Sequence, residues 1–348
     1  MILLLGATGY VGQAFSSELR RRKWSFIPLT RKAIDYTNFD ALFDYIRKMQ
    51  PEFVINAAGY APNPNLEVCE SAHWEALCAN ALLPQTVARA CLMTNTPWGH
   101  VSSGNIYAGA KIETSEGQVQ IEQNLARPEI RRLFARHPEK ILGFTEWDEP
   151  NVSFRRAPCN FYSGTKALAE EAIHGVGKYY IWRPGTLFDE RDDRRNLLSK
   201  LQQYKKVHDN IVSVTQLNDF VRACLALWEH GAAFGIYNVV NSGAVTLRRA
   251  IELIQQTLKL GREFEFIENG DESYSSLPSV LYANCVLDVS KLLAAGIKMR
   301  STEEALKSSL QKWQVAGSST AYANVDVQPM NSTLSGMALF EKLFARPT

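Results

Sequence analysis

Short apolar runs alternate with amphipathic stretches along the first half of the chain. Ile2–Leu5 is apolar at every position, as a strand buried on both faces requires, and a helical pattern follows as far as about Arg22. Residues 24–29 and 53–56 repeat the apolar run, and residues 39–49 and 67–93 repeat the helical pattern. After Pro184 the alternation loosens, but residues 235–240 still predict a strand and 246–258 a helix capped by Thr246.

A glycine-rich turn joins the first predicted strand to the first predicted helix. Its sequence is Gly6-Ala-Thr-Gly9-Tyr-Val-Gly12. Glycines allow a tight turn, close approach of the backbone to a pyrophosphate and close packing of helix on strand, while the free N–H groups of the helix N-terminus face the phosphates. The pattern predicts an α/β fold with a Rossmann-type doubly wound parallel sheet, and the length of 348 residues leaves room for a smaller C-terminal lobe. The expected cofactor contacts in this turn are Gly6, Thr8, Gly9, Tyr10, Val11 and Gly12.

The end of the second apolar run bears on the choice of cofactor. Thr30-Arg31-Lys32 stands where an NAD-selective site usually has an acidic residue for the ribose 2′-hydroxyl. Two cations there suit a 2′-phosphate and favour NADP, with NAD as the alternative cofactor and a plain solvated turn as the alternative structure. Asp35 is a further expected cofactor contact, and Thr37 or Asn38 is the expected N-cap of the next helix.

Two more predicted strands end in small or hydroxyl-bearing residues. Residues 53–56 lead into Ala57, Ala58 and Gly59, and a strand through His100 leads into Ser102-Ser103. Parallel sheets present ligand contacts at the carboxyl ends of their strands, so Ala57–Gly59 is expected against the cofactor and Ser103 beside a substrate oxygen. A simple turn is the alternative interpretation of the serines. The loop at residues 60–65 is expected to be a turn or a substrate rim.

A Tyr-x-x-x-Lys pair is the main candidate for acid-base chemistry. Tyr162 and Lys166 are four residues apart, and helical residues four apart share one face. A cation near a phenol favours the phenolate, so Lys166 is expected to lower the pKa of Tyr162. The spacing is also common on ordinary solvated helices, so it gains weight only from the other motifs.

Six motifs together resemble the extended short-chain dehydrogenases/reductases. They are Gly6–Gly12, Asn56–Gly59, Asn80-Ala, Ser102-Ser103, Tyr162-x-x-x-Lys166 and Arg183-Pro184-Gly185. Over residues 1 to about 315 the chain is most similar to the nucleotide-sugar branch that contains dTDP-4-dehydrorhamnose reductase and the plant nucleotide-rhamnose 3,5-epimerase/4-reductase. The resemblance implies a catalytic group of Ser103, Tyr162 and Lys166, with Asn80 bracing the lysine. It also implies that Lys166, Pro184 and Gly185 contact the cofactor.

The resemblance further implies reduction of a 4-keto nucleotide sugar by hydride transfer, with Tyr162 as proton donor. Related dehydratases have Asp-Glu after the catalytic hydroxyl, and related epimerase-reductases have Cys two residues after the serine. This chain has Gly104-Asn105, so dehydration is not expected and 3,5-epimerisation is in doubt. A 4-epimerase that retains NAD and a non-catalytic dinucleotide-binding regulatory subunit are the alternatives. Asn105 and Asn196 are the expected substrate contacts, with Asn196 and its neighbouring arginines near the nucleotide diphosphate.

The expected domains are a dinucleotide-binding unit at residues 1–187 with an insertion at about 113–144, a substrate lobe at 188–315, and a polar linker with a short helix at 316–348. The insertion contains an amphipathic helix at residues 128–136, for which a lid, a subunit contact and a surface insertion are the alternatives. The C-terminal helix would dock on the body or on a second subunit, so a homodimer is one expected assembly.

Composition narrows the picture further. The net charge of +2 among 348 residues gives no reason to expect a nucleic-acid partner. No apolar run approaches the ~18 residues of a membrane span. The six cysteines show no metal-ligand spacing, so no metal is expected, and they are interpreted as reduced core thiols of a cytoplasmic protein.

Overall fold

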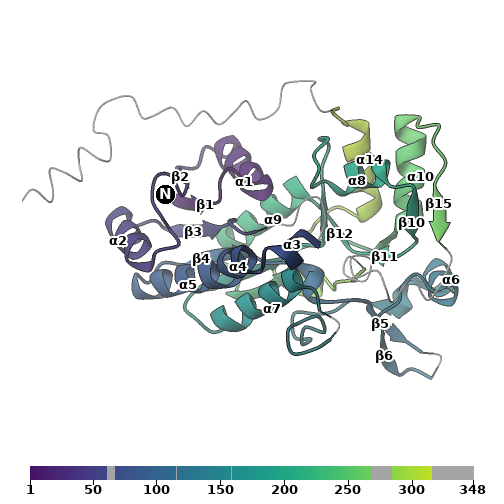
Figure 1. Cartoon of the computed structure of the whole chain (residues 1–348), viewed down its shortest axis with the longest axis horizontal. Helices are drawn as coiled ribbons and strands as arrows, with labels where there is room; N and C mark the ends of the chain where they lie inside the picture. Colours follow the sequence, from purple (N-terminus) through teal and green to yellow (C-terminus); the bar gives the residue numbers. More distant parts are fainter. Residues whose placement is uncertain (61–66, 115, 158, 268–283, 316–348) are drawn as a thin grey trace, which may run out of the picture. The chain divides into compact units, whose positions relative to one another are not determined.

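A six-stranded sheet is built from strands between residues 2 and 238 (Figure 1). The computed structural model describes residues 1–60, 67–114, 116–157, 159–267 and 284–315. The strands, in the order in which they lie side by side, are β13 (Gly235–Asn238), β8 (Tyr179–Arg183), β4 (Trp98–Val101), β3 (Phe53–Asn56), β1 (Ile2–Leu5) and β2 (Phe26–Leu29). All five pairings are parallel. Because β2 and β3 flank β1 on opposite sides, the strand order reverses at β1, where doubly wound folds bind ligands.

Helices cover both faces of this sheet. One face carries α1 (Tyr10–Arg21) and α9 (Leu217–Glu229), and the other carries α2 (Phe39–Met49), α5 (Leu83–Met93) and α7 (Phe161–Ile173). Successive residues of β1 point to opposite cores: Ile2 and Leu4 pack with α1 and α9, whereas Leu3 and Leu5 pack with α2 and α5. This burial on both faces explains the uninterrupted apolar run. The prediction of a doubly wound parallel sheet is confirmed.

Most element boundaries follow the sequence pattern. Asn38 caps α2 by accepting a hydrogen bond from the N–H of Ala41, and Thr246 caps α10 (Leu247–Leu258) in the same way. The second strand begins at Phe26 rather than Trp24. The N–H of Trp24 still donates to the carbonyl of Leu19 in the turn that ends α1, so it is not available to the sheet.

The helical stretch at residues 67–93 is broken into four pieces. They are α3 (Glu67–Ser71), α4 (His73–Leu77), the π-helical turn η1 (Cys78–Leu82) and α5. Ala72 leaves the helical backbone conformation between the first two. Pro84 has no N–H to donate to the carbonyl of Asn80, and the chain widens into the π-helical turn just before it. Asn80 therefore lies in an irregular turn, where its side chain can serve a tertiary contact.

Residues 113–144 form an excursion from the sheet. The strands β5 (Ala110–Glu113), β6 (Val119–Glu122) and β7 (Ile141–Leu142) pair as a small antiparallel sheet in the order β6-β5-β7. The amphipathic helix predicted at 128–136 is confirmed as α6 (Pro128–Arg136), and the single turn η3 (Pro138–Lys140) follows it. The apolar side chains of α6 are half buried against β5 and β7.

A separate apolar core lies in the C-terminal part. It is built around Phe188, Val214 and Leu306 and holds α8 (Leu197–Gln203), α10 and α14 (Thr302–Gln311). The remaining short elements are β9 (Thr186–Phe188), β10 (Lys206–His208), β11 (Ile211–Val212), β12 (Val214–Gln216), β14 (Val245–Thr246), β15 (Glu265–Ile267) and α13 (Ser290–Ala294). The domain boundaries at 187 and 315 stay predictions. The loop at 61–65 and the segment 316–348 lie outside the described residues.

Candidate active site

The strand ends bring the predicted motifs to one edge of the sheet. Leu5 lies opposite Asn56, Asn56 lies opposite His100, and Val101 lies opposite Trp182. The residues that follow these four strands therefore lie in a row, which is, in sheet order, Gly6, Ala57, Ser102 and Pro184. The strand ends thus lie together as predicted, and their contacts with a ligand stay a prediction.

The glycine turn is built for close backbone contact. Gly6 has a φ of +76°, and a Cβ atom there would lie 2.5 Å from the backbone nitrogen of Ala58. A side chain at Gly6 would therefore force apart the turns that follow β1 and β3. Gly9 precedes α1, whose first residue Tyr10 is buried, while Thr8 is exposed and Val11 is half buried. Gly12 packs tightly on the carbonyl of Gly6.

The turn after β2 places Arg31 and Asp35 in solvent. Arg31 is exposed beyond the carboxyl end of the strand. Asp35 accepts hydrogen bonds from the hydroxyl and N–H of Thr37, at 2.5 and 3.1 Å. These bonds, with a smaller contribution from Arg31, hold the pKa of Asp35 below its usual value.

Tyr162 and Lys166 lie on consecutive turns of α7. The helix begins at Phe161 because Asn160 caps it, accepting a hydrogen bond from the N–H of Ser163 at 2.7 Å. Burial raises the pKa of Tyr162 to about 12, and a hydrogen bond with Ser103 offsets part of that rise. The sequence argument expected Lys166 to lower this pKa, but burial dominates, so the phenol keeps its proton at neutral pH.

Lys166 is buried and donates a hydrogen bond to the carbonyl of Val101 at 3.2 Å. Burial lowers its pKa to about 8, with Glu170 acting in the opposite direction. A Cβ atom on Gly59 would lie 3.6 Å from the lysine nitrogen and 3.1 Å from the side-chain oxygen of Asn80. The lysine therefore reaches the turn that also packs against the glycine turn.

Asn80 braces this turn, and its bracing of Lys166 stays a prediction. Its side chain accepts a hydrogen bond from the N–H of Tyr60 at 2.8 Å and donates to the carbonyl of Tyr60 at 3.0 Å. It also donates to the hydroxyl of Thr165, the neighbour of Lys166, at 3.3 Å. Asn80 thus ties the chain after β3 to α7.

The predicted residues after β4 and β8 also meet. The N–H of Gly104 donates to the carbonyl of Pro184 at 2.8 Å, and the N–H of Asn105 donates to the hydroxyl of Ser103 at 3.1 Å. The side chain of Asn105 is half buried. The N–H of Gly185 donates to the hydroxyl of Thr215.

Asn196 is fully buried, and its side-chain amide donates to Asp189 and to the carbonyl of Arg191. It caps α8, so its side chain shapes the preceding loop. Binding of substrate by Asn105 and Asn196 stays a prediction.

A buried charged network lies directly behind the Tyr162 and Lys166 pair, and the sequence analysis did not single it out. Glu170, one turn after Lys166, forms a bidentate ion pair with Arg183 at 2.6 and 3.1 Å. Glu170 also accepts from Ser102, and Arg183 donates to the Tyr107 hydroxyl at 3.0 Å. The i, i+4 spacing from Lys166 to Glu170 was the available signal.

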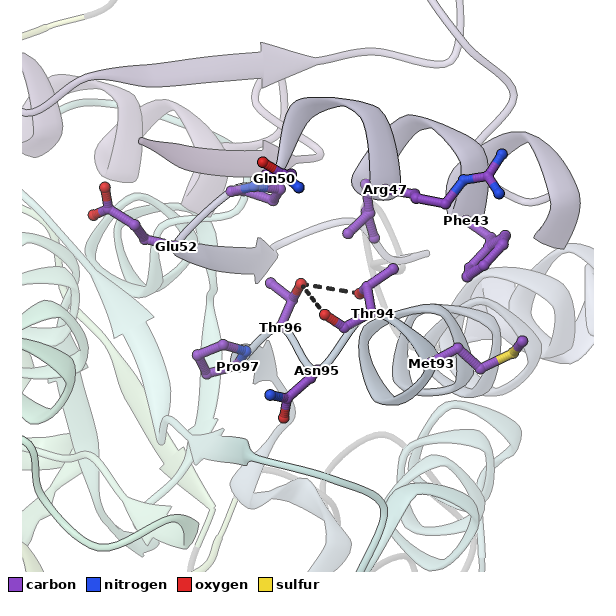
Figure 2. Close-up of a pocket in the computed structure, with 11 residues that line it drawn as sticks. Phe43, Arg47, Gln50, Glu52, Met93, Thr94, Asn95, Thr96 and Pro97 are labelled. Carbon is purple, nitrogen blue, oxygen red and sulfur yellow. Dashed lines mark hydrogen bonds between the residues drawn. The ribbon is translucent and has the colours of Figure 1, made fainter.

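A cavity of about 420 Å³ lies at the opposite edge of the sheet (Figure 2). It is lined by the ends of α2 and α5 and by Pro51 and Pro97, which precede β3 and β4. None of the predicted site residues lines it. The cavity is therefore separate from the group at the carboxyl edge.

The described residues show no cluster of three or more His, Cys, Asp or Glu side chains able to hold a metal ion. No helix within the described ranges is long and apolar enough to cross a bilayer. All six cysteines lie in the described part as free thiols, and four of them are buried. Cys78 and Cys159 are only half buried, so the prediction of core thiols is wrong for these two.

The glycine turn after β1 and the doubly wound parallel sheet define a Rossmann-type fold. Within that fold class, the chain belongs to the RmlD substrate binding domain family, whose model matches residues 1–127 and 139–315. The residues left out between these ranges include the whole of α6.

Named relatives agree with this family. The chain is 26% identical over 263 residues to a trifunctional UDP-glucose 4,6-dehydratase/UDP-4-keto-6-deoxy-D-glucose 3,5-epimerase/UDP-4-keto-L-rhamnose-reductase of Arabidopsis thaliana, covering 75% of this chain and 35% of that enzyme. It is 24% identical over 306 residues to the bifunctional dTDP-4-dehydrorhamnose 3,5-epimerase/dTDP-4-dehydrorhamnose reductase of the same plant, covering 87% and 90%. The chain thus spans about two fifths or less of the trifunctional relatives it matches.

Solved structures show the same fold. The UDP-rhamnose synthase from Acanthamoeba polyphaga mimivirus superposes with a TM-score of 0.71 at 18% identity, covering 89% of this chain and 98% of that one. The dTDP-4-dehydrorhamnose reductase from Bacillus anthracis, in complex with NADP, gives 0.67 at 19% identity, covering 88% and 97%.

Proposed function

We propose that this chain is an NADPH-dependent oxidoreductase that reduces the 4-keto group of a nucleotide-linked 4-keto-6-deoxyhexose. The observation that carries the proposal is the hydrogen bond between Ser103 and Tyr162, with the buried Lys166 one helical turn further on and next to Gly59. The functions named for the relatives support the nucleotide sugar as substrate and NADP as cofactor, with NAD as the alternative.

The glycine turn fits a dinucleotide because the space beside Gly6 admits backbone but no side chain. Gly6, Gly9 and Gly12 would hold the pyrophosphate through backbone N–H groups at the start of α1, with Thr8, Tyr10 and Val11 in the same turn. The proposed contacts elsewhere along this edge are Arg31, Asp35, Ala57, Ala58, Gly59, Lys166, Pro184 and Gly185. When bound, the nicotinamide supplies the hydride.

In the proposed mechanism Tyr162 gives its proton to the carbonyl oxygen while the carbonyl carbon gains hydride, which yields a hydroxyl group. The raised pKa of Tyr162 keeps it protonated and ready to donate at neutral pH. Ser103 donates a hydrogen bond to the same oxygen and holds it beside Tyr162. Lys166, with its cation next to Gly59, binds the cofactor ribose and stabilises the phenolate that forms.

Two other functions compete with this one. A 4-epimerase would retain NAD and return the hydride to its sugar, and a regulatory subunit would bind dinucleotide without turnover. The proximity of Tyr162 to Ser103 argues against the regulatory function, because dinucleotide binding alone does not require that hydrogen bond. Asn105 stands where related epimerase-reductases have cysteine, and its amide cannot take a proton, so reduction without 3,5-epimerisation is favoured.

The test is oxidation of NADPH and NADH by the purified protein with dTDP- and UDP-4-keto-6-deoxyglucose, followed by NMR of the products. A new 4-hydroxyl with unchanged carbons 3 and 5 is the expected result. Tyr162→Phe should lower the rate of its formation by about 10²- to 10⁴-fold, whereas Tyr45→Phe on α2 should not. Tight dinucleotide binding without oxidation by any keto sugar would overturn the reductase proposal.

A further inference from the structure

The loop between β9 and α8 lies against the glycine turn. The guanidinium carbons of Arg191 and Arg195 lie 5.8 and 5.0 Å from the centre of the Tyr10 ring. Tyr10 is the first residue of α1 and directly follows Gly9. The sequence argument associated these arginines with the diphosphate of the substrate, but the fold brings them to the turn expected to hold the cofactor.

Hydrogen bonds on two sides fix the position of this loop. The amide of Asn196 donates to the carbonyls of Asp189 and Arg191 at 2.9 and 2.6 Å. On the other side, the N–H of Gln314 donates to the carbonyl of Glu190, and the N–H of Asp192 donates to the carbonyl of Gln314. The two arginines are therefore held against α1 by a scaffold rather than extended into solvent.

Each arginine faces an aspartate, but the two pairs differ in exposure. Asp189, the partner of Arg191, is fully buried. Arg195 pairs with Asp193 through two hydrogen bonds of 2.9 Å, and the two side chains keep 31% and 28% of their surface exposed. The pair of Arg195 can therefore be exchanged for another anion with less desolvation than the pair of Arg191.

Tyr10 adds an unpartnered donor at the same place. Its side chain is 7% exposed, and its hydroxyl has no hydrogen-bond partner among the described residues. Burial raises the pKa of Tyr10 well above its usual value, with Asp189 acting in the same direction, so the hydroxyl stays protonated. A buried hydroxyl without a partner is costly, which points to an acceptor that arrives with a ligand.

From these contacts we infer that Arg195 is a pyrophosphate-binding residue of the dinucleotide site. When the dinucleotide binds, Arg195 exchanges its ion pair with Asp193 for the pyrophosphate, while the Tyr10 ring keeps the guanidinium beside the N-terminus of α1. The glycine turn has only neutral N–H donors, so Arg195 supplies the charge, and Asp193 competes with the ligand. This inference rests on the dinucleotide site of the proposed function.

The test measures the affinity for NADPH by fluorescence titration in two variants. Arg195→Ala should weaken binding by about 10- to 100-fold, because charge-assisted hydrogen bonds are lost. Asp193→Asn should tighten binding by roughly 3- to 10-fold, because it removes the competing charge. The asparagine keeps the side-chain oxygen that accepts a hydrogen bond from the backbone N–H of Arg195 at 2.8 Å, so the conformation of the loop is retained. Weaker binding in both variants would make the pair a structural brace and overturn the inference.

Arg47→Ala is the matched control. Arg47 also pairs with an aspartate, Asp44 at 2.9 Å, and lies over an aromatic ring, Phe43 at 5.5 Å, but beside the cavity at the opposite edge of the sheet. Its affinity for NADPH should equal that of the wild type. Unfolding midpoints of all variants within a few degrees of the wild type would show that they remain folded.

Two further ligands test whether Arg195 binds the pyrophosphate of the cofactor or the diphosphate of the substrate. Adenosine 2′-monophosphate has no pyrophosphate, so its affinity should be the same for the wild type and Arg195→Ala. The affinity for dTDP or UDP should also be unchanged. Loss of diphosphate binding with normal NADPH binding would place Arg195 at the substrate and overturn the inference.

The proposed function can fail separately. Opposite shifts in the two variants without any turnover would support this inference and overturn the reductase. Turnover by the wild type, with the affinity for NADPH unchanged in both variants, would support the reductase and overturn this inference. A wild type that binds no dinucleotide would overturn both.

Discussion

Lys166 and Arg183 are two buried cations at the same edge of the sheet, and their surroundings differ. Arg183, on β8, faces the carboxylate of Glu170, which lies one turn after Lys166 on α7. Both side chains are at most 5% exposed. Lys166 is bound by a backbone carbonyl, and no carboxylate among the described residues lies within ion-pair distance of it.

This difference reverses the effect of burial on the two pKa values. Burial lowers the pKa of Lys166 from 10.5 to about 8. Burial also acts against the charge of Arg183, but Glu170 and Tyr107 raise its pKa above the usual range. The arginine end of the network is a structural brace, whereas the lysine is held at a cost to stability of on the order of 3 kcal/mol at neutral pH. A buried cation whose pKa is lowered in this way is typical of a residue kept for a ligand.

Replacement of Tyr162, the proposed proton donor one turn before Lys166, should show the largest effect. We expect Tyr162→Phe to lower turnover by about 10²- to 10⁴-fold, because the proton donor is lost. Its unfolding free energy should change by about 1 kcal/mol or less, since one hydrogen bond with Ser103 is removed. Steady-state kinetics and urea unfolding measure the two quantities. Turnover at the wild-type rate would remove Tyr162 from the chemistry.

The Glu170–Arg183 ion pair should respond in the opposite way, with a large effect on the free energy of unfolding. Glu170→Gln leaves Arg183 buried without a counter-ion, so we expect it to lower the free energy of unfolding by about 3–5 kcal/mol. Glu171→Gln is the control, because Glu171 pairs with Arg155 in solvent, and its effect should lie within about 0.5 kcal/mol. Equal urea midpoints for the two variants would refute the distinction between brace and site.

Removal of the lysine charge should stabilise the protein. Lys166→Met keeps the aliphatic length and removes the buried cation, so we expect a gain of about 1–3 kcal/mol in unfolding free energy in the absence of cofactor. Turnover should be lost in the same variant. A destabilised Lys166→Met would mean that its bond to the Val101 carbonyl outweighs the cost of burial.

The gain should depend on pH with a defined sign. The pKa of Lys166 is lower in the folded chain than in the unfolded chain, so between about 8 and 10.5 the unfolded chain binds more protons. Wild-type stability contributed by this group therefore rises with pH in that window. The advantage of Lys166→Met should be largest below pH 8 and nearly absent at pH 10.5. Urea unfolding of both proteins at pH 7 and pH 10 checks the trend.

An exposed cation completes the series with the smallest effect. Arg31 lies in solvent, so its removal should leave stability unchanged. If it binds the 2′-phosphate, Arg31→Ala should weaken NADPH by about tenfold and NADH hardly at all, since only NADPH carries that phosphate. Titration with both dinucleotides measures the two affinities. An equal loss of affinity for NADPH and NADH would show that Arg31 does not select the cofactor.

The sequence predicted those parts of the site that are local in the chain. The turn at Gly6–Gly12, the caps Asn38 and Thr246, and the face shared by Tyr162 and Lys166 each depend on residues within one or two helical turns. The interruption at residues 67–93 was missed because the helical period was followed across Pro84. The direction of the Tyr162 pKa shift was missed because burial is a property of the packed chain.

The amino-acid sequence by itself determined the α/β alternation, the glycine turn and the spacing of the acid-base pair, since hydrogen bonds and periodicity act over a few residues. The tertiary structure alone decided that Glu170 neutralises Arg183, that Asn80 holds Tyr60 and Thr165, and that Arg195 lies over Tyr10. These partners come from different helices, strands and loops. Their contacts depend on how the strand ends align and on how much water is excluded, which no local pattern encodes.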